Sequence, residues 1–195
     1  MKLLLMIDRL NAWVGKSFAW CILIMTFGVS YEVLVRYMFR APTTWAFDVS
    51  YIMYGTLFMM AGAYTLSRNG HVRGDVLYRL WAPRTQAKVE LVLYILFFFP
   101  GMLALLYAGA GYAADSWRYN EVSINSPSGI PIYQLKTVIP VAAFFMLLQG
   151  IAQVIRCIVC IRTGTWPQQL HDVEETEVVL MQQRDADISK GSDGR

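Results

Sequence analysis

The sequence predicts an all-α integral membrane protein with four transmembrane helices and short interfacial helices. Apolar residues make up 56% of its 195 residues and charged residues only 16%, below the proportion of roughly 25% that is usual in soluble domains. Four apolar segments each approach the length of about 20 residues that crosses about 30 Å of hydrocarbon. The six tryptophans fall near the predicted helix ends, where aromatic residues gather at both membrane interfaces.

The four predicted spans have few charges in their interiors. They cover residues 14–34, 45–66, 89–112 and 137–160. Glu32 and Asp48 are the charged residues inside the first two spans. Glu90 and Arg156 lie near the edges of the last two spans. Charges inside a bilayer are tolerated only where they are paired or functional, so these residues become candidates for a structural or functional role.

The orientation follows from the lysines and arginines of the short loops, because cytoplasmic loops hold the excess. One side of the predicted bundle holds Lys2, Arg9, Lys16, Arg68, Arg73, Arg79, Arg84, Lys88 and Arg162. The opposite side holds Arg36, Arg40, Arg118 and Lys136. Both termini are therefore predicted to be cytoplasmic. Residues 1–163 form the membrane domain, and the polar residues 164–195 form a largely disordered tail.

The N-terminal residues before the first span have an amphipathic pattern. Apolar residues recur there at helical spacing: Leu3, Ile7, Leu10 and Val14. Asp8, Arg9 and Asn11 fall mostly on other faces. A helix over residues 2–13 that lies along the membrane surface and a short frayed extension both fit this pattern. We expect an uncleaved start, since polar residues interrupt the leucines and no convincing cleavage site follows.

Two connections are predicted to be more than simple loops. After the second span, Asn69-Gly70 is a turn signal. The apolar residues that follow it predict an interfacial arm helix: Val76, Leu77, Leu80 and Trp81. The connection over residues 113–136 contains Pro127 and Pro131, which cannot donate backbone hydrogen bonds. We expect this connection to be an ordered external loop.

The sequence carries no pattern typical of an enzyme or of a cofactor site. Its two histidines, His71 and His171, lie outside the spans, so they cannot form an intramembrane pair that holds haem. Cys157 and Cys160 form a Cys-x-x-Cys without a second pair, which favours ordinary apolar cysteines. No nucleophile elbow or phosphate-binding loop is present. No polar site of the kind that transporters use is evident at mid-membrane.

Glu32 has two interpretations. Arg36 follows it by one helical turn, a spacing that predicts an ion pair. A protonatable glutamate in the first of four helices is also similar to that of small multidrug transporters, which exchange drugs for protons. At about 1.5 Å per residue, Glu32 lies roughly 27 Å from Val14. This depth is near the outer surface rather than the midplane and favours the structural pair.

Asp48 also has two interpretations, which the sequence leaves open. It stands in the first turn of the second helix, where a carboxylate favours the positive end of the helix dipole and Thr43 or Thr44 can serve as the cap. Alternatively, Asp48 forms a charged cluster with Glu32, Arg36 and Arg40 at the outer end of a helix hairpin.

The order and spacing of these residues resemble the small membrane subunit, DctQ, of tripartite ATP-independent periplasmic transporters. The resemblance rests on Glu32, Arg36-Tyr37, Phe39, Pro42, Trp45, Asp48, His71-Val72-Arg73-Gly74-Asp75, Ser126-Pro127, Ile130-Pro131, Lys136, Ile139-Pro140 and Gln149-Gly150. It extends over about residues 5–163. Asp48 stands where glutamate is more usual, and Gly74 where an aliphatic residue is more usual.

The resemblance implies a non-catalytic scaffold subunit of a sodium-coupled transporter in the bacterial inner membrane. In that family a large polytopic subunit carries organic acid and sodium in a moving elevator domain, and an extracytoplasmic binding protein delivers the substrate. We expect the chain to contact membrane lipids. We expect it to bind no cofactor and no nucleic acid. The structural or interface candidates are Glu32, Arg36, Arg40, Trp45, Asp48, His71, Arg73, Asp75, Lys136 and Gln149. A self-sufficient proton-coupled exporter that uses Glu32 is the alternative, and a membrane anchor for an unrelated enzyme is a third possibility.

Overall fold

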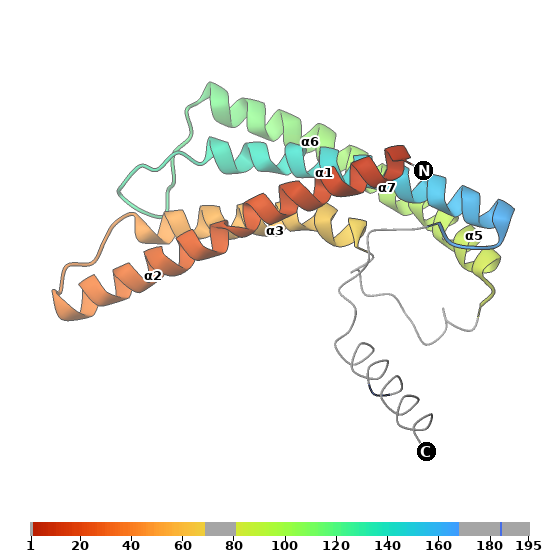
Figure 1. The fold of residues 1–195 in the computed structure, drawn as a ribbon. Coiled ribbons are helices and arrows are strands. Elements are labelled where there is room, and N and C mark those ends of the chain that lie inside the picture. Colours follow the sequence, from red (N-terminus) through yellow and green to blue (C-terminus); the bar gives the residue numbers. More distant parts are fainter. Residues whose placement is uncertain (1, 69–80, 168–183, 185–195) are drawn as a thin grey trace, which may run out of the picture.

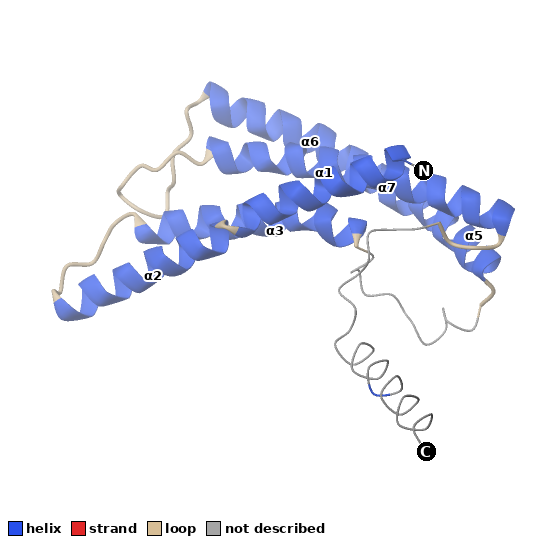
Figure 2. Cartoon of the chain, viewed as in Figure 1, coloured by secondary structure: helices blue, strands red, loops and turns tan. Residues whose placement is uncertain are grey.

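The computed structural model describes residues 2–68, 81–167 and 184 of the chain. In these residues every regular element is a helix (Figure 2). The helices are α1 (Lys2–Ala19), α2 (Cys21–Met38), α3 (Ala46–Ser67), α5 (Pro83–Leu93), the π-helix η1 (Tyr94–Phe98), α6 (Phe99–Arg118) and α7 (Tyr133–Thr163). They form an elongated bundle (Figure 1). The predicted all-α class is confirmed.

Helices α1 and α2 form one nearly continuous helix of 36 residues. Trp20, which separates them, keeps a right-handed helical backbone with φ −61° and ψ −22°. At about 1.5 Å per residue the pair is about 54 Å long. The first half packs on α3 and α7 and the second half on α3 (Figure 1). No residue of α2 is buried within the chain.

Helices α5, η1 and α6 form a second continuous stretch of 36 residues. Pro83 stands in its first turn, where the missing backbone donor costs nothing. Pro100 lies inside it and cannot donate to the carbonyl of Leu96, so the helix needs a local change of hydrogen bonding. The π-helix directly before Pro100, in which Phe99 N–H bonds to Tyr94 O, provides this change.

Helix α7 is the last element and packs against α3, α5 and α6. Pro140 lies inside it and faces Gly109 of α6, where a side chain would press on Ile139. The helix ends at Gly164, whose left-handed backbone (φ 82°) lets its N–H bond to Cys160 O at 2.7 Å. Glycine is suited to this cap because it adopts positive φ without strain.

Three helical stretches are long and apolar enough to cross a membrane: Leu3–Met38, Pro83–Arg118 and Tyr133–Thr163. Helix α3 has 22 residues, about 33 Å, but is not among the three. These three stretches support the predicted membrane protein, while the fourth span and the cytoplasmic termini stay predictions. The predicted arm helix before Trp81 and most of the predicted tail lie outside the described residues.

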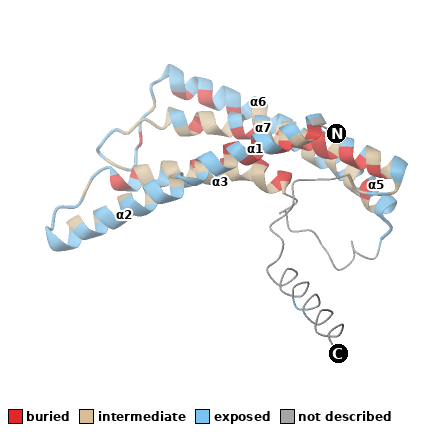
Figure 3. Cartoon of the chain, in the orientation of Figure 1, coloured by how far each residue is buried: buried red, intermediate tan, exposed pale blue. Residues whose placement is uncertain are grey.

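The N-terminal segment differs from both of its interpretations. Helix α1 is not a frayed extension, and it is not a separate surface helix, because it continues into α2 and packs along α3 and α7. Buried residues alternate with exposed ones along α1 (Figure 3). Leu3 is 60% and Trp13 68% exposed, whereas Asp8 and Asn11 are buried together with Val14. Polar and apolar side chains of α1 therefore both contact the bundle.

Candidate functional site

Five polar side chains from the two ends of the chain meet inside the bundle. They are Asp8 and Asn11 of α1, and Gln149, Gln153 and Arg156 of α7. Their spacing places each set on one face of its helix. All five are buried, and Asp8, Gln149 and Arg156 are 0% exposed. We refer to these five residues as the buried polar network.

An ion pair between Asp8 and Arg156 forms the centre of the buried polar network. The other oxygen of Asp8, Oδ1, accepts a hydrogen bond of 2.8 Å from Gln149 Nε2. Gln149 Oε1 in turn accepts a bond of 2.6 Å from Asn11 Nδ2. The amide of Gln149 thus bridges two residues of α1, and both oxygens of the Asp8 carboxylate are occupied.

The network reaches a third helix through Gln153, whose Nε2 donates to Leu66 O of α3 at 3.2 Å. Its two charges cancel. Three of its atoms, Asn11 Oδ1 and Arg156 Nε and Nη1, are buried without a hydrogen-bond partner in the described part of the chain. Burying a charged pair costs several kcal/mol of desolvation free energy per ion. Because these three atoms lack partners, the hydrogen bonds of the network offset this cost only in part. The arrangement favours a role in specifying which helices pair.

The buried polar network lies near the middle of α7, and the expectation that no transport site lies at mid-membrane stays a prediction. At about 1.5 Å per residue, Gln149 lies about 24 Å from Tyr133 and 21 Å from Thr163, near the middle of α7. Asp8 and Asn11 precede the first predicted span, so the hydropathy pattern does not reveal them. The usable signal is the spacing of the polar residues at positions 149, 153 and 156, which line one face of an apolar helix.

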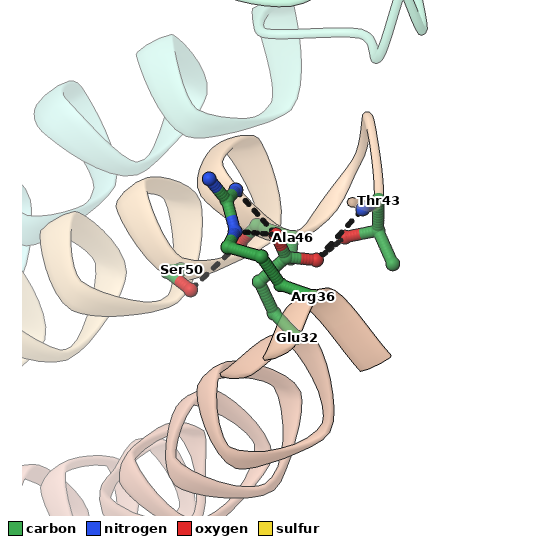
Figure 4. A network of polar contacts seen from close by, with 5 residues as sticks. All are labelled: Glu32, Arg36, Thr43, Ala46 and Ser50. Carbon is green, nitrogen blue, oxygen red and sulfur yellow. Dashed lines mark hydrogen bonds and ion pairs between the residues drawn. The ribbon is translucent and has the colours of Figure 1, made fainter. Parts of the chain in front are cut away.

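A second polar group joins α2 to the loop before α3, about 36 Å along the α1–α2 helix from the buried polar network. Arg36 Nε donates to Glu32 Oε1 at 2.8 Å, and Thr43 N donates to Glu32 Oε2 at 2.9 Å (Figure 4). The Thr43 hydroxyl also donates to Oε2. Trp45 stacks on Tyr31 with ring centroids 6.0 Å apart. The predicted pair of Glu32 with Arg36 is therefore formed within α2, and the bonds from Thr43 to Glu32 close the α2–α3 hairpin.

Asp48 ties the first turn of α3 to the loop over residues 119–132, which we call the external loop after its predicted side of the membrane. Its Oδ1 accepts a hydrogen bond of 2.6 Å from Ser123 Oγ, and its Oδ2 accepts one from Ser126 Oγ. Ser128 Oγ donates to Thr44 O at 2.6 Å beside them. Asp48 is only 1% exposed. Two contacts with Asp48 and one with Thr44, just before α3, thus give the expected order of this loop a physical basis.

The cluster of four charges at this end is not formed. No contact described by the structure joins Asp48 to Glu32, and Arg40 is exposed with a φ of 53°. A threonine cap is absent as well, because Trp45 is the N-cap and makes no side-chain cap bond. The position of Asp48 in the first turn, which suits the helix dipole, is as expected.

A comparison with protein families places these residues in context. The model of the family described as tripartite ATP-independent periplasmic transporters, DctQ component, matches residues 25–160. The chain belongs to the DctQ family. The match includes Glu32, Asp48 and Arg156, whereas Asp8 and Asn11 precede it. DctQ proteins are transporter components and are not a known enzyme family. A comparison with curated proteins gives no match.

Lys136 of this DctQ chain lies at the start of α7, beside the external loop. It forms an ion pair with Glu121, and its Nζ lies 3.9 Å from the ring centroid of Tyr112. The hydrogen bond from Lys136 lowers the pKa of the Glu121 carboxyl, so Glu121 stays ionised at neutral pH. Lys136 therefore has an identified partner in the structure.

Sequence patterns in this DctQ chain also single out the histidine, arginine and aspartate after the second predicted span and the two cysteines of α7. His71, Arg73 and Asp75 lie outside the described residues. Cys157 and Cys160 of α7 are buried, and neither forms a disulfide in the described residues. In the part of the chain that the structure describes, no three His, Cys, Asp or Glu side chains lie close enough together to hold a metal ion.

Replacing Asp48 by alanine is expected to release the external loop while leaving α3 folded. Each lost hydrogen bond to a charged group is worth about 1.5–3 kcal/mol, so cleavage of the loop by a broad-specificity protease should accelerate roughly tenfold or more. Ser50→Ala is the matched control, because Ser50 Oγ bonds only within α3, to Ala46 O at 2.7 Å (Figure 4). Equal cleavage rates in the two variants would contradict the role of Asp48.

Proposed function

We propose that this chain is the non-catalytic scaffold subunit of a sodium-coupled transporter that imports organic acids. It resides in the bacterial inner membrane with four spans and both termini in the cytoplasm. A large polytopic subunit, which carries substrate and sodium in an elevator domain, packs against it, and an extracytoplasmic binding protein delivers the substrate. Membership of the DctQ family supports the proposal.

The ion pairs within the chain are the main observation that supports the scaffold role. Charged groups at the helix contacts pair with each other. Asp8 pairs with Arg156, Glu32 with Arg36, and Glu121 with Lys136. Each pair has no net charge; the first joins α1 to α7, the third joins a loop to α7, and Glu32 of the second also binds Thr43 in the loop before α3. Transport sites instead present polar groups to a substrate at broken helices. Pairs that fix one helix against another suit a rigid support for a moving partner.

The exposed apolar surface supports the same role. Helix α2 buries no residue within the chain, and the most apolar part of the stretch from Pro83 to Arg118 is likewise unburied. These two stretches present broad apolar faces, which suit contact with lipid and with the large subunit. The length of α3, about 33 Å, supports a fourth span. The excess of lysine and arginine on one side supports cytoplasmic termini.

The alternative of a proton-coupled exporter requires Glu32 to bind and release a proton. Arg36 and Thr43 occupy both oxygens of its carboxylate. Protonation of Glu32 would break these contacts and open the α2–α3 hairpin. An exporter would have to open and close the hairpin in every transport cycle. The contacts therefore favour the scaffold role.

Affinity purification of the full chain from its native membrane in mild detergent tests the proposal. We expect a large polytopic membrane protein at equal stoichiometry. Glu32→Gln should lower its recovery and the rate of uptake without changing which substrate is taken up, because the α2–α3 hairpin loosens. Asp115→Asn, at an exposed acid of α6, is the matched control and should behave as the wild type.

Two results would contradict the scaffold role. Recovery of a homo-oligomer alone would favour the exporter, and a changed substrate profile in Glu32→Gln would place Glu32 in a transport site.

A further inference from the structure

A cavity of about 290 Å³ lies where the external loop meets α3, α6 and the first turns of α7. Its walls combine the Glu121–Lys136 ion pair with apolar side chains, among them Leu135 and Ile139 of α7. Ile124 of the loop stands at its rim. The volume is at the lower end of the range for small-molecule sites, about 300–1,000 Å³.

The depth of the cavity follows from the elements that enclose it. The loop joins two stretches long and apolar enough to cross a membrane, ending at Arg118 and beginning at Tyr133. Irregular backbone exposed to lipid does not occur within the hydrocarbon, so the loop lies at the level of the headgroups. Tyr51 and Tyr112, which also line the cavity, are of the type that gathers at this level.

The two charges in the wall can each accept a further partner. The ammonium group of Lys136 has three donors, of which Glu121 takes one while Tyr112 lies against another side of the group, so one remains for a ligand. The carboxylate of Glu121 has unused lone pairs, and its side chain is 39% exposed. The pair has no net charge, so it does not attract an ion of one sign strongly. A group that carries both signs at a short separation complements it.

Ile124 indicates that the mouth of the cavity is covered in the membrane. It is 96% exposed, more than any other large apolar side chain in the described part of the chain. Exposure of the Ile124 side chain to water is unfavourable. A lipid acyl chain lying over the rim of the cavity would shield this side chain from water.

We propose that the cavity binds a zwitterionic phospholipid with a primary ammonium in its headgroup. The phosphate lies against Lys136, the ammonium donates to Glu121, and the first methylenes of an acyl chain lie against Leu135, Ile139 and Ile124. This site is separate from the proposed transport role and requires only that the chain resides in a membrane.

Native mass spectrometry of the full chain, delipidated in mild detergent and titrated with lipids of identical acyl chains, tests the site. Phosphatidylethanolamine should bind at a roughly tenfold lower concentration than phosphatidylglycerol, the effect of one hydrogen bond between charged groups. Phosphatidylcholine, which has no N–H donor, should bind more weakly than phosphatidylethanolamine. Glu121→Gln should abolish the preference, and Ile124→Asp should weaken binding of all three lipids.

Tyr119→Asp is the matched control for Ile124→Asp, because Tyr119 is exposed in the same loop region and does not line the cavity. It should bind lipid as the wild type does. If Glu121→Gln fails to fold, Ile124→Asp still tests the site, since that side chain makes almost no packing contacts. Equal or tighter binding of phosphatidylglycerol by the wild type would overturn the proposal. Unchanged binding in Ile124→Asp would overturn it too.

Discussion

Arg156→Met is expected to destabilise the folded chain by about 3–5 kcal/mol, the cost of leaving a buried charge without its partner. Asp8 lies at 0% exposure, and its carboxylate would keep only the hydrogen bond from Gln149. For a chain of this length the change corresponds to a fall of about 6–20 °C in the midpoint of thermal unfolding. Thermal unfolding of the purified chain in detergent, followed by the loss of its monodisperse peak, measures it.

The double variant Asp8→Leu/Arg156→Met should recover most of this loss. Buried ion pairs can often be replaced by apolar residues of similar volume at little cost. Recovery should be incomplete, because Gln149 Nε2 would lose its acceptor, at about 1–3 kcal/mol. Arg162→Met, at an exposed cation of the same helix, is the control and should change stability by less than about 0.5 kcal/mol. An effect of Arg156→Met no larger than that of Arg162→Met would show that the ion pair does not hold α1 to α7.

Two glycines of the first long helix should respond to alanine with opposite signs. A Cβ atom at Gly15 would lie 2.5 Å from Cβ of Tyr64 in α3, and an atom so close to the α3 backbone cannot move aside without the helix. Gly15→Ala should therefore cost about 1–3 kcal/mol or more. Gly28 has no neighbour within 4 Å, so Gly28→Ala should stabilise by up to about 1 kcal/mol through helix propensity.

The same thermal assay compares these two variants, and each serves as the control of the other. A joint fall of similar size would mean that lost flexibility, rather than the close approach of α1 and α3, determines the response. Gly15→Ala with unchanged stability would show that these helices do not touch at Gly15 in the membrane.

The sequence is sufficient for features that depend on neighbouring residues. The helices follow from long apolar stretches, and the pair of Glu32 with Arg36 follows from a spacing of one turn. The family follows from an ordered set of short motifs between about residues 25 and 160. In each case the interacting groups are near each other in the chain, or the pattern repeats along one helix.

Contacts between distant residues could not be predicted in the same way. Asp48 accepts from Ser123 across 75 residues, and a first-turn aspartate has an adequate local explanation without that contact. Asp8 and Asn11 are polar residues near the N-terminus. The mean hydropathy of their segment predicts that they face water. Their burial depends on the polar face of α7 at Gln149, and the sequence contains no local sign of which helix will cover them.

The separation of Asp8 and Arg156 along the chain bears on how the protein is made. They are 148 residues apart. A ribosome that adds 5–20 residues per second supplies Arg156 about 7–30 s after Asp8. During that interval the carboxylate has no counter-ion, and a lone charge is costly inside the bilayer. We therefore expect the part of α1 around Asp8 to dock into the bundle only after α7 has been made.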